Sequence, residues 1–181
     1  MSIALSLQPV AVTGWRRPYA VALAALDVAA AWTIVGLVAV MVAVVSAQVF
    51  MRYALNSSVG WADEVSRLMF VWSIFLAIPL GIKVGAHIGV EMLTARVPAL
   101  ARELLARASA AAGAALMGLV SWQAMVITRD QWDEQMASAN ASAALFILAL
   151  AVGCGHSALH FFWIVLAGRP ERDEEIAREL D

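Results

Sequence analysis

A long uncharged stretch, residues 28–51, constrains the fold of this chain more than any other feature. It holds 24 consecutive residues without a charged side chain, and three further apolar stretches follow it. At a rise of about 1.5 Å per residue, a helix of roughly 20 apolar residues crosses the hydrocarbon core of a bilayer. The composition agrees, with 62% hydrophobic residues, 14% charged residues and a mean hydropathy of +0.80. The sequence therefore predicts an all-α integral membrane protein without a soluble active site, and we expect no enzyme.

The spacing of the apolar stretches predicts one membrane domain over residues 1–181, with four transmembrane helices. We expect the spans at about residues 20–51, 61–83, 108–128 and 143–166. Residues 84–107 alternate apolar and charged side chains around Pro98, which is typical of an amphipathic helical segment lying in the membrane interface. Residues 1–17 and 169–181 are then tails on the same side of the membrane as this segment.

The positive charges indicate which side that is. Of the 12 Lys and Arg residues, nine lie in the two tails, in the 84–107 segment or at Lys83. Only Arg52 and Arg129 lie on the other side, and Arg67 lies within the second span. Cytoplasmic segments carry an excess of Lys and Arg. We therefore expect a multi-pass protein of the bacterial inner membrane with both termini and the amphipathic segment in the cytoplasm.

Several classes of chemistry have no motif in this chain. Cys154 is the only cysteine, so an intrachain disulfide and a cysteine-based metal cluster are both excluded. No basic patch is interleaved with aromatic residues, and no phosphate-binding loop, nucleophile elbow or zinc-type His-Glu pattern is present. We expect no catalytic residue, no cofactor, no metal and no nucleic-acid partner.

The start of the second span carries the densest group of polar residues. Asp63 and Glu64 precede Arg67 by four and three residues, so the three side chains share one helical face. Ionisable groups at the end of a membrane helix usually face protein rather than lipid. The group is then a clamp between helices or subunits, a helix cap with an interfacial ion pair or, as the weakest of these alternatives, part of a substrate path. His87 and Glu91 form a second i, i+4 pair, which we interpret as a structural hydrogen bond.

Three further ionisable residues lie within predicted spans. His156 and His160 are one turn apart on the fourth span and suggest haem ligation. Two histidines on one helix face, however, do not reach opposite sides of one haem iron. We expect them to bond to neighbouring groups near the inner interface. Asp27 lies near the headgroups, with no evident acidic partner in another span, and we expect no special role for it.

Small residues recur every four positions on three of the spans. Such stripes allow close approach of another helix, within the chain or from a partner. They comprise Ala39, Ala43 and Ala47 on the first span, Ala110, Ala114 and Gly118 on the third, and Ala149, Gly153 and Ser157 on the fourth.

One stretch of motifs resembles a known family. Arg52-Tyr53 is followed by Trp61-Ala62-Asp63-Glu64 with Arg67, Trp72 and Phe75, and then by His87-Ile88-Gly89-Val90-Glu91. This pattern resembles the small membrane subunit (Q-type, DctQ-like) of TRAP transporters, the tripartite ATP-independent periplasmic transporters. The four spans, the length and the amphipathic segment are also similar. Two details differ, namely Ala77-Ile78-Pro79 after the second tryptophan and the absence of a proline at the entry to the last span.

The resemblance implies a role within a complex. In that family a periplasmic substrate-binding protein captures a small organic anion, commonly a carboxylate, and a large multi-span membrane subunit moves it with an ion gradient. The small subunit is part of the static scaffold, in contact with membrane lipids. On that interpretation Trp61, Asp63, Glu64, Arg67, Trp72, His87 and Glu91 lie at helix or subunit interfaces. Two alternatives stay open: a membrane anchor of a respiratory enzyme that binds haem or quinone, and a stand-alone membrane protein.

Overall fold

A computed structural model describes residues 16–57, 59–83 and 99–167 of the chain. Four long α-helices account for most of them: α2 (Arg17–Ala54), α3 (Trp61–Lys83), α5 (Ala99–Asp130) and α6 (Ala144–Ala167). Each is long and apolar enough to cross a membrane. The predicted fold class, an all-α membrane protein with four transmembrane helices, is confirmed.

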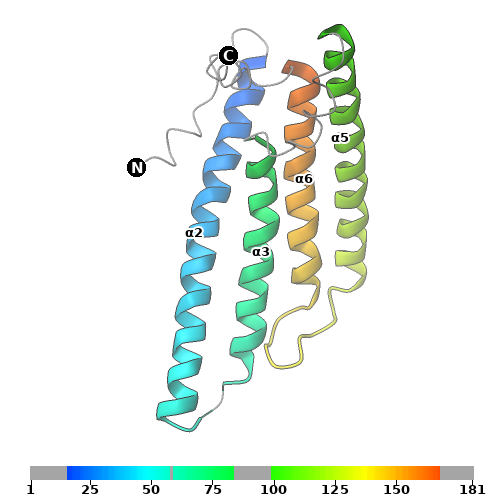
Figure 1. The fold of residues 1–181 in the computed structure, drawn as a ribbon. Helices are drawn as coiled ribbons and strands as arrows, with labels where there is room; N and C mark the ends of the chain where they lie inside the picture. Colours follow the sequence, from blue (N-terminus) through cyan, green and yellow to red (C-terminus); the bar gives the residue numbers. More distant parts are fainter. Residues whose placement is uncertain (1–15, 58, 84–98, 168–181) are drawn as a thin grey trace, which may run out of the picture.

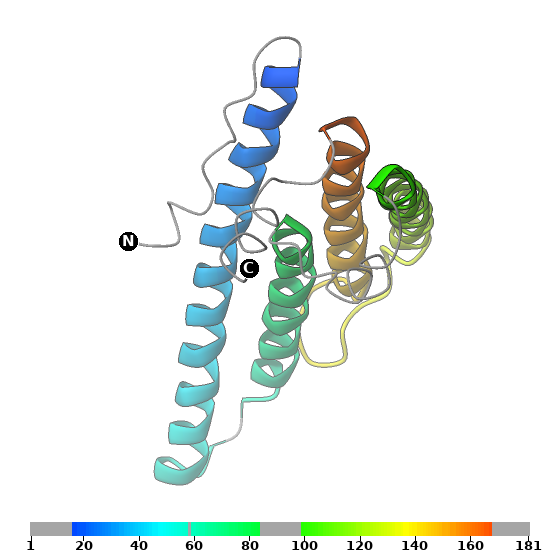
Figure 2. The ribbon, with the colours of Figure 1, turned by 45° about the horizontal axis from the view of Figure 1, so that its top comes forward.

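The helices alternate in direction and stand side by side in the order α2, α3, α6, α5 (Figure 1). Helix α6, the last of the four described helices, thus lies between the second and third spans, and it packs on both α3 and α5. The first helix packs mainly on α3, and it diverges from the rest of the bundle (Figure 2). Only 6% of the residues in the most apolar stretch of α2 are therefore buried, compared with 39% in that of α6.

Helix α2 is much longer than a bilayer requires. Its 38 residues correspond to about 57 Å, compared with roughly 30 Å of hydrocarbon. It begins at Arg17, with Pro18 in its first turn, where the missing N–H and the fixed φ of proline suit a helix start. Its far end has a turn in which Asn56 adopts a positive φ of 50°, a conformation that asparagine tolerates better than most residues.

Helix α5 begins earlier than the predicted third span. Residues 99–107, expected within the interfacial segment, continue without a break into the membrane helix. Because Arg107 pairs with Glu103 one turn before it, charged residues in this stretch support a helix as well as an interface location. The remainder of the expected amphipathic segment, residues 84–98, lies outside the described residues, as do the two tails.

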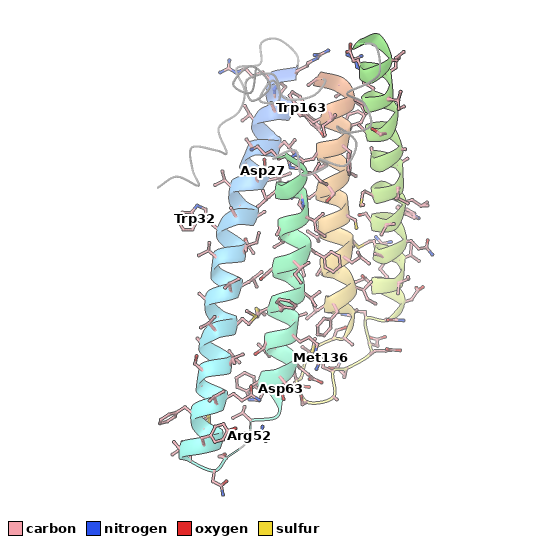
Figure 3. The ribbon with its side chains drawn as sticks, in the orientation of Figure 1. Asp27, Trp32, Arg52, Asp63, Met136 and Trp163 are labelled. Carbon is pink, nitrogen blue, oxygen red and sulfur yellow. The ribbon has the colours of Figure 1, made fainter. Side chains whose placement is uncertain are left out.

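The two ends of the bundle are chemically distinct. The starts of α2 and α5 and the ends of α3 and α6 meet at one end, which we call the Asp27 end (Figure 3). The 55–60 turn and the 131–143 connection lie at the other, which we call the Glu64 end. Each end contains a cluster of polar contacts that joins helices distant in the sequence.

Candidate functional site

The most buried ionisable side chain described in the structure is Asp27 on α2, which is 1% exposed. Its Oδ2 atom accepts a hydrogen bond from the Lys83 ammonium at 2.9 Å. Its Oδ1 atom lies 3.0 Å from Nε2 of His156 and 2.8 Å from Nε2 of His160. These four residues, the Asp27 cluster, join α2, α3 and α6 at one end of the bundle (Figure 3).

Helix geometry explains how these residues meet. His156 and His160 are four apart on α6, so both rings project from the same face, with ring centroids 5.0 Å apart. Lys83 is the last residue of α3, and its flexible stem reaches back to Asp27. Since α2 runs opposite to α3, a residue about 15 Å from the start of α2 lies level with the end of α3.

The cluster contains an ion pair supplemented by two imidazole rings. Lys83 supplies one positive charge and Asp27 one negative charge, while each ring in its Nε2–H tautomer donates a hydrogen bond to Oδ1. A buried ion pair needs such additional hydrogen bonds to offset its desolvation. Every buried side-chain nitrogen and oxygen in the described part of the chain has a hydrogen-bond partner. The arrangement is a satisfied polar network in an otherwise apolar bundle.

This cluster differs from what the sequence led us to expect. We expect no special role for Asp27 from the sequence, because it lies near the headgroups and has no evident acidic partner, but its partners are an ammonium and two imidazole rings. The two histidines do bond a neighbouring group, which is Asp27 rather than a residue near them in the sequence. Both Nε2 atoms converge on one oxygen from one helix face, and this is not the opposed geometry of two axial haem ligands. The sequence signal that could have revealed the cluster is the position of its four residues, which lie at the same depth in the membrane when neighbouring helices run in opposite directions.

Two aromatic residues join α2 to α6 beside this cluster. The Tyr19 hydroxyl donates a hydrogen bond to the Leu159 carbonyl at 2.7 Å, and its ring stacks on Trp163 with centroids 5.6 Å apart. Tyr19 and Asp27 are separated by about two helical turns and lie on the same side of α2. The Asp27 end of α2 is therefore bound to α6 by two independent groups of contacts.

Glu64 organises the opposite end of the bundle. Its Oε1 atom accepts the backbone N–H of Ala137 at 2.9 Å, and its Oε2 atom accepts those of Ser138 and Ala139 at 2.9 and 2.7 Å. The Ser138 hydroxyl donates to the Gly60 carbonyl at 2.9 Å. One carboxylate at the start of α3 thus binds the connection between α5 and α6. We call these contacts the Glu64 clamp.

The other polar residues at this end have separate partners. Asp63 accepts a hydrogen bond from Gln48 of α2 at 2.9 Å. Arg67 is exposed, and within the described residues it pairs with neither Asp63 nor Glu64. Ion pairs along one helix face, one of the alternatives for this group, are therefore not seen among the described residues, because both acids bind groups from other segments. Trp61 is about half exposed, whereas Nε1 of Trp72 donates to the Leu145 carbonyl of α6 at 3.1 Å.

The three small-residue stripes have different environments. On α6 all three residues are buried against neighbouring helices: Ala149, Gly153 and Ser157. On α5 Ala110 is buried, while Ala114 and Gly118 are partly exposed. On α2 all three residues are exposed: Ala39, Ala43 and Ala47. His87 and Glu91 lie outside the described residues.

The sequence model of one family, "Tripartite ATP-independent periplasmic transporters, DctQ component", matches residues 41–168, well over half of the chain. The chain belongs to this DctQ family. The predicted resemblance is thereby confirmed, and so is the expectation of a protein that is not an enzyme, because the family is a transporter component. This DctQ-family protein is a multi-pass membrane protein, and the model that it matches is that of the DctQ component of these transporters.

Individual relatives carry the same description. A "C4-dicarboxylate TRAP transporter small permease protein DctQ" from Vibrio cholerae is 36% identical over 93 residues, which cover 49% of this chain and 40% of the relative. A protein of the same name from Rhodobacter capsulatus is 23% identical over 107 residues, covering 59% of this chain and 47% of that one. A "Putative TRAP transporter small permease protein" from Haemophilus influenzae is 24% identical over 127 residues, covering 70% and 74%. The chain thus spans less than half the length of the first two relatives.

The family match covers all of the Glu64 clamp but only part of the Asp27 cluster in this DctQ-family protein. The matched residues include Glu64 and the 137–139 amides, as well as His156 and His160. Asp27 precedes the first matched residue. The Asp27 cluster therefore joins a residue from outside the matched region to residues within it.

Proposed function

We propose that this small permease subunit is a static scaffold for the large multi-span membrane subunit of its transporter. That transporter takes up a small organic anion, most simply a carboxylate, with a periplasmic binding protein and an ion gradient. The C4-dicarboxylate named for two relatives supports this substrate class. The positive charges support insertion in the inner membrane with both termini in the cytoplasm.

The exposed face of α2 is the observation that carries the scaffold role. Ala39, Ala43 and Ala47 lie in line on a helix that packs on α3 with a different face. Small residues allow two membrane helices to approach closely, and packing of this kind drives helix association where lipid removes the hydrophobic driving force. The stripe is therefore suited to a helix of the large subunit, with lipid around the remaining apolar surface.

Co-purification from the native membrane tests this proposal. The chain carries an affinity tag, is extracted in mild detergent, and its companions are identified and quantified by mass spectrometry. We expect a stoichiometric multi-span permease. Recovery with soluble redox subunits would support the respiratory-anchor alternative instead, and recovery of the chain alone would contradict a stable complex.

A pair of matched substitutions assigns the contact to the stripe. Ala43→Phe places a large ring in the middle of the stripe, whereas Val45→Phe places the same ring about 200° around the helix. Both positions are exposed in the isolated chain, so neither change disturbs its own packing. We expect Ala43→Phe to reduce recovery of the large subunit several-fold and Val45→Phe to leave it unchanged. Equal recovery with both variants would remove α2 from the interface.

A further inference from the structure

The scaffold role makes no use of the Asp27 cluster. This cluster brings together three potential metal ligands. Asp27 Oδ1 and the Nε2 atoms of His156 and His160 all lie within 4.8 Å of one another, and all three residues are buried. Each offers one atom of a type that zinc binds, two imidazole nitrogens and one carboxylate oxygen. An i, i+4 pair of histidines on one helix face is also a recurring way of presenting two zinc ligands.

Two of the three distances between the ligand atoms are close to those of a tetrahedral site. Two ligands that each lie about 2.0–2.1 Å from a tetrahedral Zn²⁺ are about 3.3 Å apart. The Nε2 atoms of His156 and His160 lie 3.0 and 2.8 Å from Oδ1 of Asp27. For an ion to bind, each ring must carry its proton on Nδ1 and leave Nε2 free, and small rotations of the side chains open the space for the ion. We propose that Asp27, His156 and His160 bind a divalent transition-metal ion of the zinc class, with water completing the coordination.

Lys83 is the competitor for this site. Its ammonium already neutralises Asp27 from the other carboxylate oxygen, at 2.9 Å. A divalent ion on Oδ1 would place two cations on one carboxylate in a buried setting, which is unfavourable at low dielectric. The Lys83 side chain is 25% exposed, so its long stem can carry the ammonium towards water when an ion binds. Metal and Lys83 therefore bind Asp27 in competition.

The competition has a structural consequence. In the ion-free state, Asp27 joins α2 to both α3 and α6. With a metal ion bound, the link to α3 is released and the link to α6 is replaced by coordination. Metal binding thus changes how the end of α3 is held. The site stands independently of the scaffold role, because it depends only on contacts within this chain.

Titration of the purified full chain with metal tests the proposal. The protein carries no polyhistidine tag, is freed of metal with a chelator, and is titrated with Zn²⁺ by calorimetry and with Co²⁺ by visible absorption. We expect one ion per chain with a Kd of about 10 µM or tighter, equivalent to at least about −7 kcal/mol. The Co²⁺ complex should show the intense d–d absorption of four-coordinate cobalt. Absence of saturable binding by roughly 100 µM free Zn²⁺ would overturn the proposal.

Three variants separate this site from adventitious binding. His156→Gln and His160→Gln each remove a ligand and should weaken Zn²⁺ binding at least about 100-fold. Lys83→Gln removes the competing charge but keeps a donor for Asp27, and it should tighten binding by about tenfold. Cys154→Ala on the same helix is the matched control, since Cys154 is buried but outside the cluster, and it should leave binding unchanged.

Different results with these variants would each contradict a specific part of the proposal. Binding that persists in both histidine variants would place the ion elsewhere. Weaker binding in Lys83→Gln would show that Lys83 supports the site rather than competing with it. If a variant does not fold, as judged by gel filtration, the Co²⁺ spectrum of the wild-type protein still decides whether nitrogen and oxygen ligands hold the ion.

Discussion

The backbone carbonyl of Phe75 on α3 faces Gly153 on α6 without room for a side chain between them. A Cβ atom added to Gly153 would overlap the Phe75 carbonyl oxygen and lie 2.8 Å from the Phe75 Cβ. Phe75 is four residues before Pro79, which has no N–H to donate to that carbonyl. The Phe75 carbonyl therefore lacks the usual hydrogen bond from the residue four positions later in α3. Gly153 allows the backbone of α6 to approach this carbonyl closely.

Gly153→Ala is therefore expected to destabilise the bundle. Because the overlap is with backbone, α3 and α6 must move apart, at a cost of about 1–3 kcal/mol. Thermal unfolding in detergent, followed by a fluorescent thiol-independent probe, measures the effect. Gly118→Ala is the control, since a Cβ atom at Gly118 meets nothing within 4 Å. Equal midpoints for the two variants would contradict the close α3–α6 approach.

The Asp27–Lys83 ion pair should be costly to break from one side only. Lys83→Met leaves the buried Asp27 without its ammonium partner, and the loss should be about 3–5 kcal/mol. Asp27→Asn combined with Lys83→Met removes both charges, so the double variant should be more stable than Lys83→Met alone. Unfolding is measured in the presence of a chelator to exclude metal binding. A double variant that loses the sum of both single effects would show that the two charges do not interact.

The Glu64 clamp predicts a local rather than a global effect. In Glu64→Ala the N–H groups of Ala137, Ser138 and Ala139 lose their acceptor, so their hydrogen exchange should accelerate by roughly tenfold or more. Exchange within α5 should stay the same. Asp63→Asn is the matched control, because Asp63 binds Gln48 and not the connection. Unchanged exchange in Glu64→Ala would mean that the connection holds its own conformation.

Membrane orientation can be measured with single cysteines. In a Cys154→Ala background, Ser57→Cys at the Glu64 end should react with a membrane-impermeant maleimide in intact spheroplasts. Ala167→Cys at the Asp27 end should react only after the membrane is permeabilised. Both positions are exposed, so access to the reagent depends on the side of the membrane. The reverse pattern would place the termini outside, against the distribution of Lys and Arg.

The sequence predicted well those features that depend on a single helix. Hydropathy and length identified four membrane helices. The start of α5 was harder to predict from the sequence, since residues 99–107 carry charges that suit either an interface helix or an extension of a membrane helix. Periodicity within one segment does not distinguish these two cases.

The partners of the polar residues depend on how helices are aligned with one another. Asp27 and His160 are 133 residues apart, and Glu64 binds amides more than 70 residues away. Local spacing favoured Arg67 as the partner of Glu64 because i, i+3 pairs are common on helices. Three backbone N–H groups in a connection leave no pattern of side-chain types, so a clamp between helices could be considered from the sequence, but its partners could not be predicted from composition or spacing.

The position of α6 between α3 and α5 also bears on how the protein is made. Because α6 follows α5 in the chain, α5 leaves the ribosome before the helix that it packs against. Until then Asp27 has Lys83 but neither histidine, and the α5–α6 connection has not yet reached Glu64. The contacts that join α6 to the other helices therefore form after α2, α3 and α5 have been synthesised. A chain cut short after α5 would leave three spans without a common neighbour, and we expect the cell to degrade it.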